Sequence, residues 1–177
     1  LHSSARRQRQ MCIRDSPFTA ALVTEKFKEK KIDIIPYLKI VKLNGTIDLN
    51  PFKIEFVTLT HSIIEPNGLK IDTPAGTIFH TGDWKVDPNP LVGKNINQEK
   101  LKKIGDNGVL AMICDSTNVF SIGRAGSESD VRKNMLNVMS RQKKKILVTS
   151  FSSNVARMET LFLCAEKIGR HISLVGR

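Results

Sequence analysis

The chain has 177 residues, which is enough for one domain with a hydrophobic core, or for one domain and part of a second. Hydrophobic residues make up 40% and charged residues 25%, and no apolar run approaches the roughly 18 residues that a membrane-spanning helix needs. The net charge of +11 favours a polyanionic partner such as nucleic acid, although a generic lysine-rich surface would carry the same charge.

Residues 1–16, LHSSARRQRQMCIRDS, lack apolar periodicity and are rich in arginine. We interpret them as a non-native, adapter-like tail and exclude them from the fold. The alternative is a basic arm that binds nucleic acid. Four arginines and one aspartate give this stretch a charge of +3, which leaves +8 on residues 17–177. The three cysteines show no paired or metal-type spacing, and no secretory signal is visible, so we expect a reducing, cytoplasmic setting.

From Pro17 the pattern becomes regular, and it predicts a helix followed by extended segments. Asn44-Gly45 is a strong hairpin turn signal between two short strands. The expected elements are a helix over 19–31, an extended piece over 32–35 and a hairpin of 37–43 with 46–49.

Three further strands are predicted by alternating polar and apolar residues over 53–59, 68–72 and 77–80. A meander of these strands runs up, down and up, because Thr73-Pro74-Ala75-Gly76 supplies a turn. His61 and Asp83 follow the first and third strands, so we expect both at the same rim of one sheet. An imidazole and a carboxylate together can form a metal site or an acid/base pair.

The second half of the chain alternates helix and strand, which indicates an α/β fold. A helix is expected over 97–104, and the apolar run 109–114 predicts a strand buried on both faces that ends at Asp115. The remaining expected elements are helices over 127–142 and 154–168, the second closed by Gly169, and strands over 145–150 and 171–175.

Several motifs in this order resemble bacterial ribonuclease J, a nuclease of the metallo-β-lactamase fold with an inserted β-CASP domain. The motifs are PFTAAL from Pro17, Thr60-His61-Ser62, HTGDWKVD from His80, CDSTN from Cys114 and FSSNVAR from Phe151. The resemblance covers residues 17–177. It implies a partial metallo-β-lactamase αββα sandwich over 17–120 and the beginning of a β-CASP domain over 121–177.

The resemblance also implies roles for single residues. His61 would be a zinc ligand, Asp83 would bridge two metal ions, and Asp115 would lie beside the metal centre and assist catalysis. Two Zn²⁺ ions, or Mn²⁺ or Mg²⁺ in their place, could activate water and stabilise the charge on an RNA phosphodiester. The partner would be RNA with no membrane contact, and the full-length parent would be a homo-oligomer, a dimer or a tetramer.

The family's main metal-binding motif, His-x-His-x-Asp-His, is absent from the sequence. We therefore expect an internal fragment that binds zinc weakly and cleaves little RNA alone. The sequence leaves open whether the parent cuts as an exonuclease or an endonuclease. The alternatives are another metallo-β-lactamase-fold hydrolase acting on small esters or lactones, and a non-catalytic RNA-binding module.

Other polar residues have less certain roles. Ser152, Ser153 and Asn154 open a helix, and with Arg157 they either contact an RNA phosphate or simply cap the helix. His80 is expected to be structural, with a supporting contact to a metal ligand as the alternative. The lysine runs at 28–31 and 143–145 are expected to be solvated faces that help steer RNA at low salt.

Overall fold

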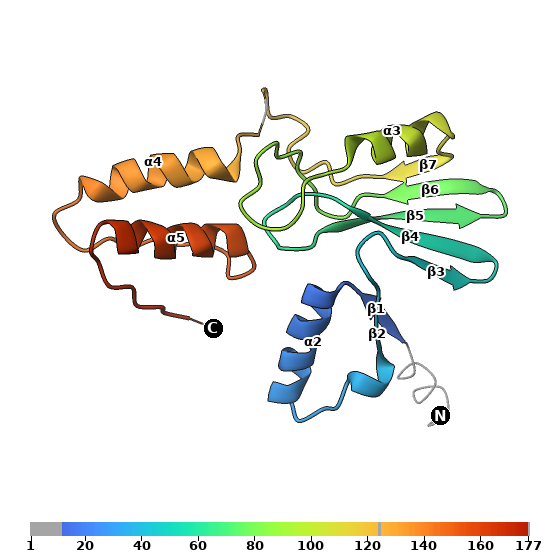
Figure 1. Ribbon diagram of the computed structural model, residues 1–177, viewed down its shortest axis with the longest axis horizontal. Coiled ribbons are helices and arrows are strands. Elements are labelled where there is room, and N and C mark those ends of the chain that lie inside the picture. The colour runs from blue at the N-terminus through green and yellow to red at the C-terminus, as the bar shows by residue number, and fades with distance from the viewer. Residues whose placement is uncertain (1–11, 124, 177) are drawn as a thin grey trace.

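The computed structural model describes residues 12–123 and 125–176, and Figure 1 shows three groups of elements. A twisted sheet carries one helix on its face, a small two-stranded unit lies below it, and a pair of helices extends to one side. The strands are β1 (Ile13–Asp15), β2 (Leu38–Ile40), β3 (Thr46–Leu49), β4 (Phe52–Thr58), β5 (Asn67–Thr73), β6 (Gly76–His80) and β7 (Ala111–Ile113). The helices are α2 (Pro17–Glu29), a 3-10 turn (Ile35–Tyr37), α3 (Gln98–Asp106), α4 (Glu128–Ser140) and α5 (Val155–Lys167).

None of the helices in this described part of the chain is long and apolar enough to span a membrane.

The predicted meander is confirmed. The main sheet has the order β3-β4-β5-β6-β7, antiparallel except for the parallel pair β6–β7. In β4 the side chain of Val57 points to the same face as Phe79 of β6, and both pack on Ile104 of α3 to form a buried core. The alternation in β4 therefore places its apolar side chains toward the core, as predicted. Burying each such side chain stabilises the fold by about 1.5–3 kcal/mol. The α/β class predicted from the sequence is confirmed by this layer of helix on sheet.

The predicted hairpin of 37–43 with 46–49 is wrong, although its turn forms. Gly45 N–H donates to the Lys42 carbonyl at 2.8 Å, and Asn44 has a φ of 59°. The flanking strands nevertheless join different sheets: β2 pairs in parallel with β1, and β3 pairs with β4. The reason is that β2 and β4 compete for β3 as a neighbour. The connection from β3 to β4 is shorter than the connection from β2 to β3, so β3 pairs with β4.

Part of residues 1–16, which we excluded from the fold, forms the strand β1. β1 pairs with β2, with Ile13 opposite Leu38, and Val41 N–H donates to the Asp15 carbonyl at 2.8 Å. Ser16 is fully buried at the start of α2, where its carbonyl accepts the Ala20 N–H at 2.9 Å. The non-native origin of residues 1–16 stays a prediction, and residues 1–11 lie outside the described residues.

The prediction of a doubly buried strand over 109–114 is wrong. The run forms only the short strand β7, and Met112 is 63% exposed. β7 lies at the edge of the sheet, so it has one neighbour where a buried parallel strand needs two. Cys114 is correspondingly only half-buried, whereas Cys164, in α5, is buried.

Of the expected helix–strand alternation after residue 126, only the helices form. α4 and α5 match the predicted ranges, and Gly169, with a φ of 65°, follows α5 as its predicted stop. Residues 145–150 and 171–175 are irregular instead of extended, and Leu147 is 96% exposed. A parallel strand is stable only beside another strand, and the described residues place none next to either segment.

Candidate functional site at the sheet edge

The three residues that the sequence singled out for chemistry lie at one edge of the main sheet. β4 and β6 run in the same direction because both are antiparallel to β5, and β7 is parallel to β6. All three strands therefore end at the same edge. His61 follows β4, Asp83 follows β6 and Asp115 follows β7, with Asp83 exposed and the other two half-buried.

Hydrogen bonds join the segments that carry His61 and Asp83. Lys85 N–H donates to the Thr60 carbonyl at 2.8 Å, and the Thr60 hydroxyl donates to the Lys85 carbonyl in return. The same hydroxyl accepts the Asp87 N–H at 3.1 Å, and Thr60 is buried. Thr60 thus binds the loop after β6 directly beside His61, which fixes the two candidate residues to a common support.

The segment that carries Asp115 is joined to the same loop. Thr81 N–H donates to the Ile113 carbonyl at 2.9 Å, and the Thr81 hydroxyl accepts the Asp115 N–H at 3.2 Å. The Trp84 indole N–H donates to the Asp115 carbonyl at 3.2 Å. Gly82, which lies between Thr81 and Asp83, has a φ of 59°, a left-handed conformation that suits glycine. The Asp83 loop is therefore held from both sides.

The Asp115 carboxylate is held in its charged form. Its Oδ1 accepts hydrogen bonds from the Thr117 hydroxyl and, at 3.0 Å, from the Thr117 N–H. These bonds, with a smaller contribution from the nearby His61 imidazole, lower the pKa of Asp115 below its ordinary value. The Nδ1 of His61 lies 3.2 Å from the Ser62 hydroxyl. The charge of His61 contributes to the lowered pKa of Asp115, so these two side chains lie near each other.

A zinc ion needs about four ligands, usually arranged as a tetrahedron. Among the described residues, no three His, Cys, Asp or Glu side chains converge in a way that could hold a metal ion. His61, Asp83 and Asp115 alone therefore do not fit a complete zinc site, and no chemical step through a metal follows from this chain's residues.

The residues predicted to meet an RNA phosphate lie close to this edge, but they have other partners. The Asn154 side chain caps α5 by accepting the Arg157 N–H at 2.9 Å, and the Arg157 guanidinium lies 3.2 Å from Glu128. Ser152 and Ser153 are exposed in the preceding turn. The Ala156 N–H lies 3.3 Å from the Ser62 carbonyl, which brings the start of α5 beside the His61 loop. Contact with RNA stays a prediction.

His80 has the structural role that was expected for it. Its Nδ1 accepts the Gly82 N–H at 3.0 Å and so supports the turn before Asp83.

Sequence reasoning missed the role of Asp87, although it quoted the motif that contains it. Burial raises the pKa of Asp87, but the neighbouring Ser127 side chain, the hydrogen bonds from the backbone N–H groups of Glu128 and Asn89, and the charge of Lys85 together bring it below its ordinary value. A buried aspartate is rarely ionised without such partners. The sequence signal was an acidic residue within an otherwise apolar and proline-rich stretch.

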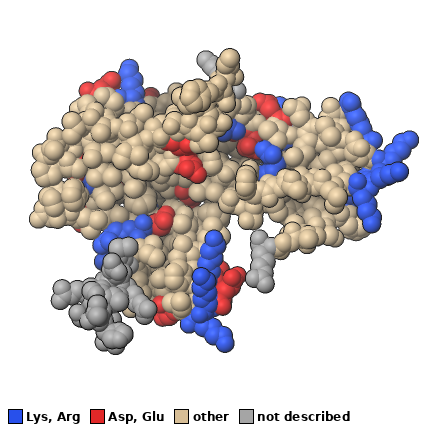
Figure 2. All heavy atoms as spheres, turned by 180° about the vertical axis from the view of Figure 1, so that it is seen from behind, with Lys and Arg blue, Asp and Glu red and all other residues tan. Residues whose placement is uncertain are grey.

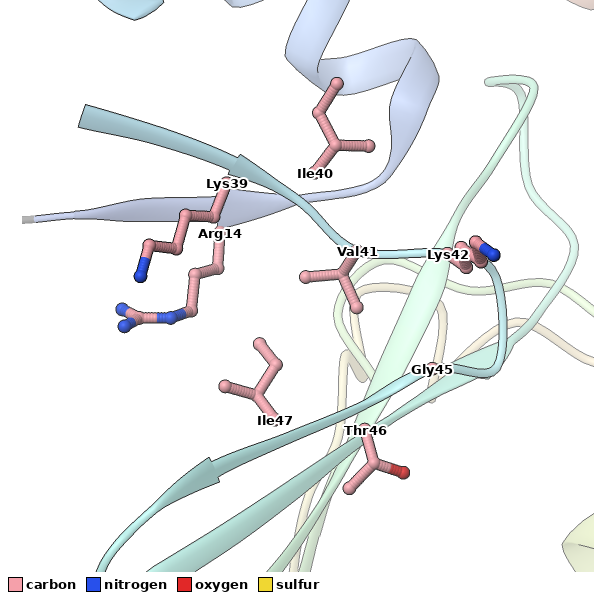
Figure 3. A pocket seen from close by; sticks show the side chains of 8 residues that line it. All are labelled: Arg14, Lys39, Ile40, Val41, Lys42, Gly45, Thr46 and Ile47. Carbon is pink, nitrogen blue, oxygen red and sulfur yellow. The ribbon is translucent and has the colours of Figure 1, made fainter. Parts of the chain in front are cut away.

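A hollow of about 340 Å³ lies elsewhere, between the two-stranded unit and β3 (Figure 3). It is open and carries basic and aliphatic side chains, including Arg14, Lys39 and Ile47. None of the candidate site residues lines it.

No protein-family model matches the chain. Among curated proteins it is similar to ribonuclease J of Sinorhizobium meliloti, with 40% identity over 162 residues, covering 91% of this chain and 28% of that protein. Ribonuclease J of Corynebacterium glutamicum is 38% identical, covering 92% of this chain and 22% of that protein. The ribonuclease J of Methanocaldococcus jannaschii is 37% identical over 167 residues, covering 92% of this chain and 37% of that protein. The resemblance predicted from the motifs is confirmed, and the chain spans between about a fifth and two fifths of these relatives.

Among solved structures, a protein of unknown function from Enterococcus faecalis shares the fold with a TM-score of 0.51 at 16% identity. The match covers 73% of this chain and 31% of that one. Together with the relatives, it supports the α/β fold class that was predicted.

Proposed function

Since this chain is a relative of ribonuclease J over about nine tenths of its length, we propose that it is part of a ribonuclease that hydrolyses RNA phosphodiesters. The observation that carries the proposal is the common sheet edge, where His61, Asp83 and Asp115 follow three strands that end together. Imidazole and carboxylate groups at one edge suit a hydrolytic centre. We assign His61 and Asp83 as metal ligands and Asp115 as a carboxylate beside the metal.

The proposed cofactor is zinc, two ions per complete site, with Mn²⁺ or Mg²⁺ as substitutes. When bound, such ions would lower the pKa of a water molecule and stabilise negative charge on the phosphate. This chain's residues would hold and orient the catalytic groups. Thr117 lowers the pKa of Asp115 and orients its carboxylate, and Thr60 and Trp84 hold the loop that carries Asp83. The ligands that complete the site would come from the His-x-His-x-Asp-His motif, which this sequence does not contain.

The proposed partner is RNA. The chain carries a net charge of +11, and Figure 2 shows basic side chains projecting from the end of the molecule formed by α4 and α5. Such a surface would attract a polyanion at low salt. We also propose a cytoplasmic location and a homo-oligomeric parent enzyme.

A graft tests the function. Residues 17–177 would replace the matching segment of the Sinorhizobium meliloti ribonuclease J, and hydrolysis of a 5′-monophosphorylated RNA would be measured. We expect RNA cleavage by the graft and a loss of at least about 100-fold on Asp83→Asn or Asp115→Asn. Asp106→Asn is the matched control, because Asp106 is exposed at the end of α3, and it should leave the rate unchanged.

An inactive graft that folds, or one that cleaves a thioester or lactone but no RNA, would refute the proposal. The isolated 177-residue chain should show no turnover, because its described residues bring no three metal-binding side chains together.

The lack of three converging metal-binding side chains among the described residues favours a second candidate, a non-catalytic RNA-binding module. It predicts that the chain binds RNA without metal and that the graft stays inactive. Metal content of the purified graft distinguishes the two, since the ribonuclease proposal requires zinc that is lost with Asp83→Asn.

A further inference from the structure

Four charged side chains form a cluster between the Asp83 loop and the two helices, which we call the loop–helix cluster: Lys85, Asp87, Glu128 and Arg157. Lys85 Nζ lies 3.9 Å from Asp87 Oδ2 and 3.7 Å from Glu128 Oε1. Arg157 Nη2 lies 3.2 Å from Glu128 Oε2. Glu128 is the central member, because it contacts both cations.

The cluster is shielded from water. Glu128 is only 9% exposed and Asp87 6% exposed, and the side chains of Lys85 and Arg157 are about three quarters covered. Two cations and two anions balance each other within it. A charge in such a place is stable only when it is paired, so loss of one member leaves another buried and uncompensated.

The cluster joins segments that are distant in the sequence. Lys85 and Asp87 follow Asp83 in the loop after β6, Glu128 is the first residue of α4, and Arg157 lies in the first turn of α5. Asp87 Oδ2 also accepts the Glu128 N–H at 2.9 Å, and the Ser127 hydroxyl donates to the Asn89 carbonyl at 2.9 Å. The start of α4 is therefore bound to the Asp83 loop by backbone and side-chain contacts at once.

We infer that Glu128 is a positioning residue, which uses Lys85 and Arg157 to hold the Asp83 loop in place against α4 and α5. The functional meaning of this inference rests on the proposed function, in which Asp83 is a metal ligand. Glu128 touches no reacting atom; it acts through Lys85, two residues after Asp83. A ligand on an exposed loop needs this kind of support, since metal sites depend on groups that orient the ligands.

The same two helices supply a matched control. Arg132 of α4 pairs with Glu159 of α5 at 2.5 Å, and Arg132 Nε also lies 3.1 Å from the Thr160 hydroxyl. In the part of the chain that the structure describes, this pair joins α4 to α5 and makes no hydrogen bond or ion pair with the Asp83 loop. A role limited to helix packing would therefore be shared by Glu159, whereas a positioning role belongs to Glu128 alone.

Trp84 provides the readout, because it is the single tryptophan of the chain and lies between Asp83 and Lys85. Trp84 is 36% exposed, and its indole N–H donates to the Asp115 carbonyl. We propose to measure its emission maximum and its quenching by acrylamide in Glu128→Gln and Glu159→Gln, at temperatures where both variants are folded by circular dichroism. Both changes remove one negative charge and keep the side-chain size.

We expect Glu128→Gln to shift the Trp84 emission to the red and to increase its quenching, with Glu159→Gln matching the unchanged chain. Equal spectra in all three proteins, or equal shifts in the two variants, would overturn the inference. If Glu128→Gln does not fold, the pair Arg157→Gln and Arg157→Lys replaces it. Arg157→Gln should produce the red shift, and Arg157→Lys, which keeps the charge, should keep the original spectrum. Failure of either expectation overturns the inference as well.

A second measurement separates this inference from the proposed function. In the grafted ribonuclease, Glu128→Gln should weaken zinc binding by about 10- to 100-fold, and Glu159→Gln should not. If the Trp84 emission shifts but the graft binds no zinc, the inference that Glu128 positions the loop stands. The proposal that Asp83 is a metal ligand is then wrong. Normal zinc binding in Glu128→Gln shows instead that the loop needs no such support.

Discussion

Replacement of Asp87 by alanine should destabilise the chain more than any change of an exposed carboxylate. The Asp87 carboxylate accepts the N–H groups of Glu128 and Asn89, both at 2.9 Å, and lies 3.9 Å from Lys85. Alanine leaves both N–H groups without their acceptor and removes one of the two carboxylates that lie near Lys85. A hydrogen bond to a charged group contributes about 1.5–3 kcal/mol, so two of them predict a loss of about 3–6 kcal/mol in the free energy of unfolding.

The assay is urea unfolding followed by circular dichroism, with Asp33→Ala as the control. Asp33 is exposed and accepts one N–H, from Ile35 at 3.0 Å, so its loss should cost no more than about 1 kcal/mol. Equal losses for the two variants would refute the reasoning that buried acceptors at the start of α4 stabilise the fold.

The effect should also depend on pH with a definite sign. The pKa of Asp87 is lowered in the folded chain, so its charge stabilises the fold above the ordinary aspartate pKa of about 3.9 and loses that effect as the pH falls through the lower folded value. The difference between the unchanged chain and Asp87→Asn should therefore be constant between about pH 5 and 7 and shrink in more acidic solution. A difference that grows on acidification contradicts the assignment.

Three further predictions concern the core, Asp115 and RNA. Phe79→Ala should lower the free energy of unfolding by about 3–5 kcal/mol because it opens a cavity against Val57 and Ile104, while Phe120→Ala, at 95% exposure, should change it by less than about 0.5 kcal/mol; similar losses would contradict the core assignment. Thr117→Ala should raise the pKa of Asp115 toward its ordinary value in an NMR titration, and Thr117→Ser should not. Changing Lys143, Lys144 and Lys145 to glutamine should reduce the salt dependence of single-stranded RNA binding by a slope of about 2, since each phosphate contact contributes about 0.7. The same change at Lys28, Lys30 and Lys31, where Lys28 already pairs with Glu25 at 3.7 Å, should have less effect, and equal effects would indicate general charge attraction.

The parts of the fold that the sequence predicted are those decided by local pattern. Alternation in residues 53–59 sets which side chains face α3, and a two-residue turn joins β5 to β6, so the meander followed from neighbouring residues alone. The Asn44-Gly45 turn was also local and formed, but the pairing of its flanks depended on β1 and β4. Turn chemistry fixes a reversal of the backbone and does not fix which strand becomes the neighbour.

Burial was harder to predict, because it depends on what other segments cover. The run 109–114 has the composition of an interior strand, yet it lies at an edge and is largely exposed. The same holds for the candidate site. The shared edge of His61 and Asp83 was predicted from strand directions, and the place of Asp115 was predicted from the resemblance. The contact of Asp87 with Glu128 spans 41 positions, and no periodicity in the sequence predicts it.

Within residues 12–123 and 125–176, no strand pairs with the outer edge of β7, and this has a practical consequence for work with the chain. A strand edge with free backbone groups and the apolar side chains of Met112 and Ile113 is a template for self-association. The charge of +11 opposes this by long-range repulsion between molecules, whose reach shrinks to about 10 Å at 0.1 M salt. We therefore expect the chain to stay monomeric in buffers of low ionic strength and to self-associate through the β7 edge at high salt.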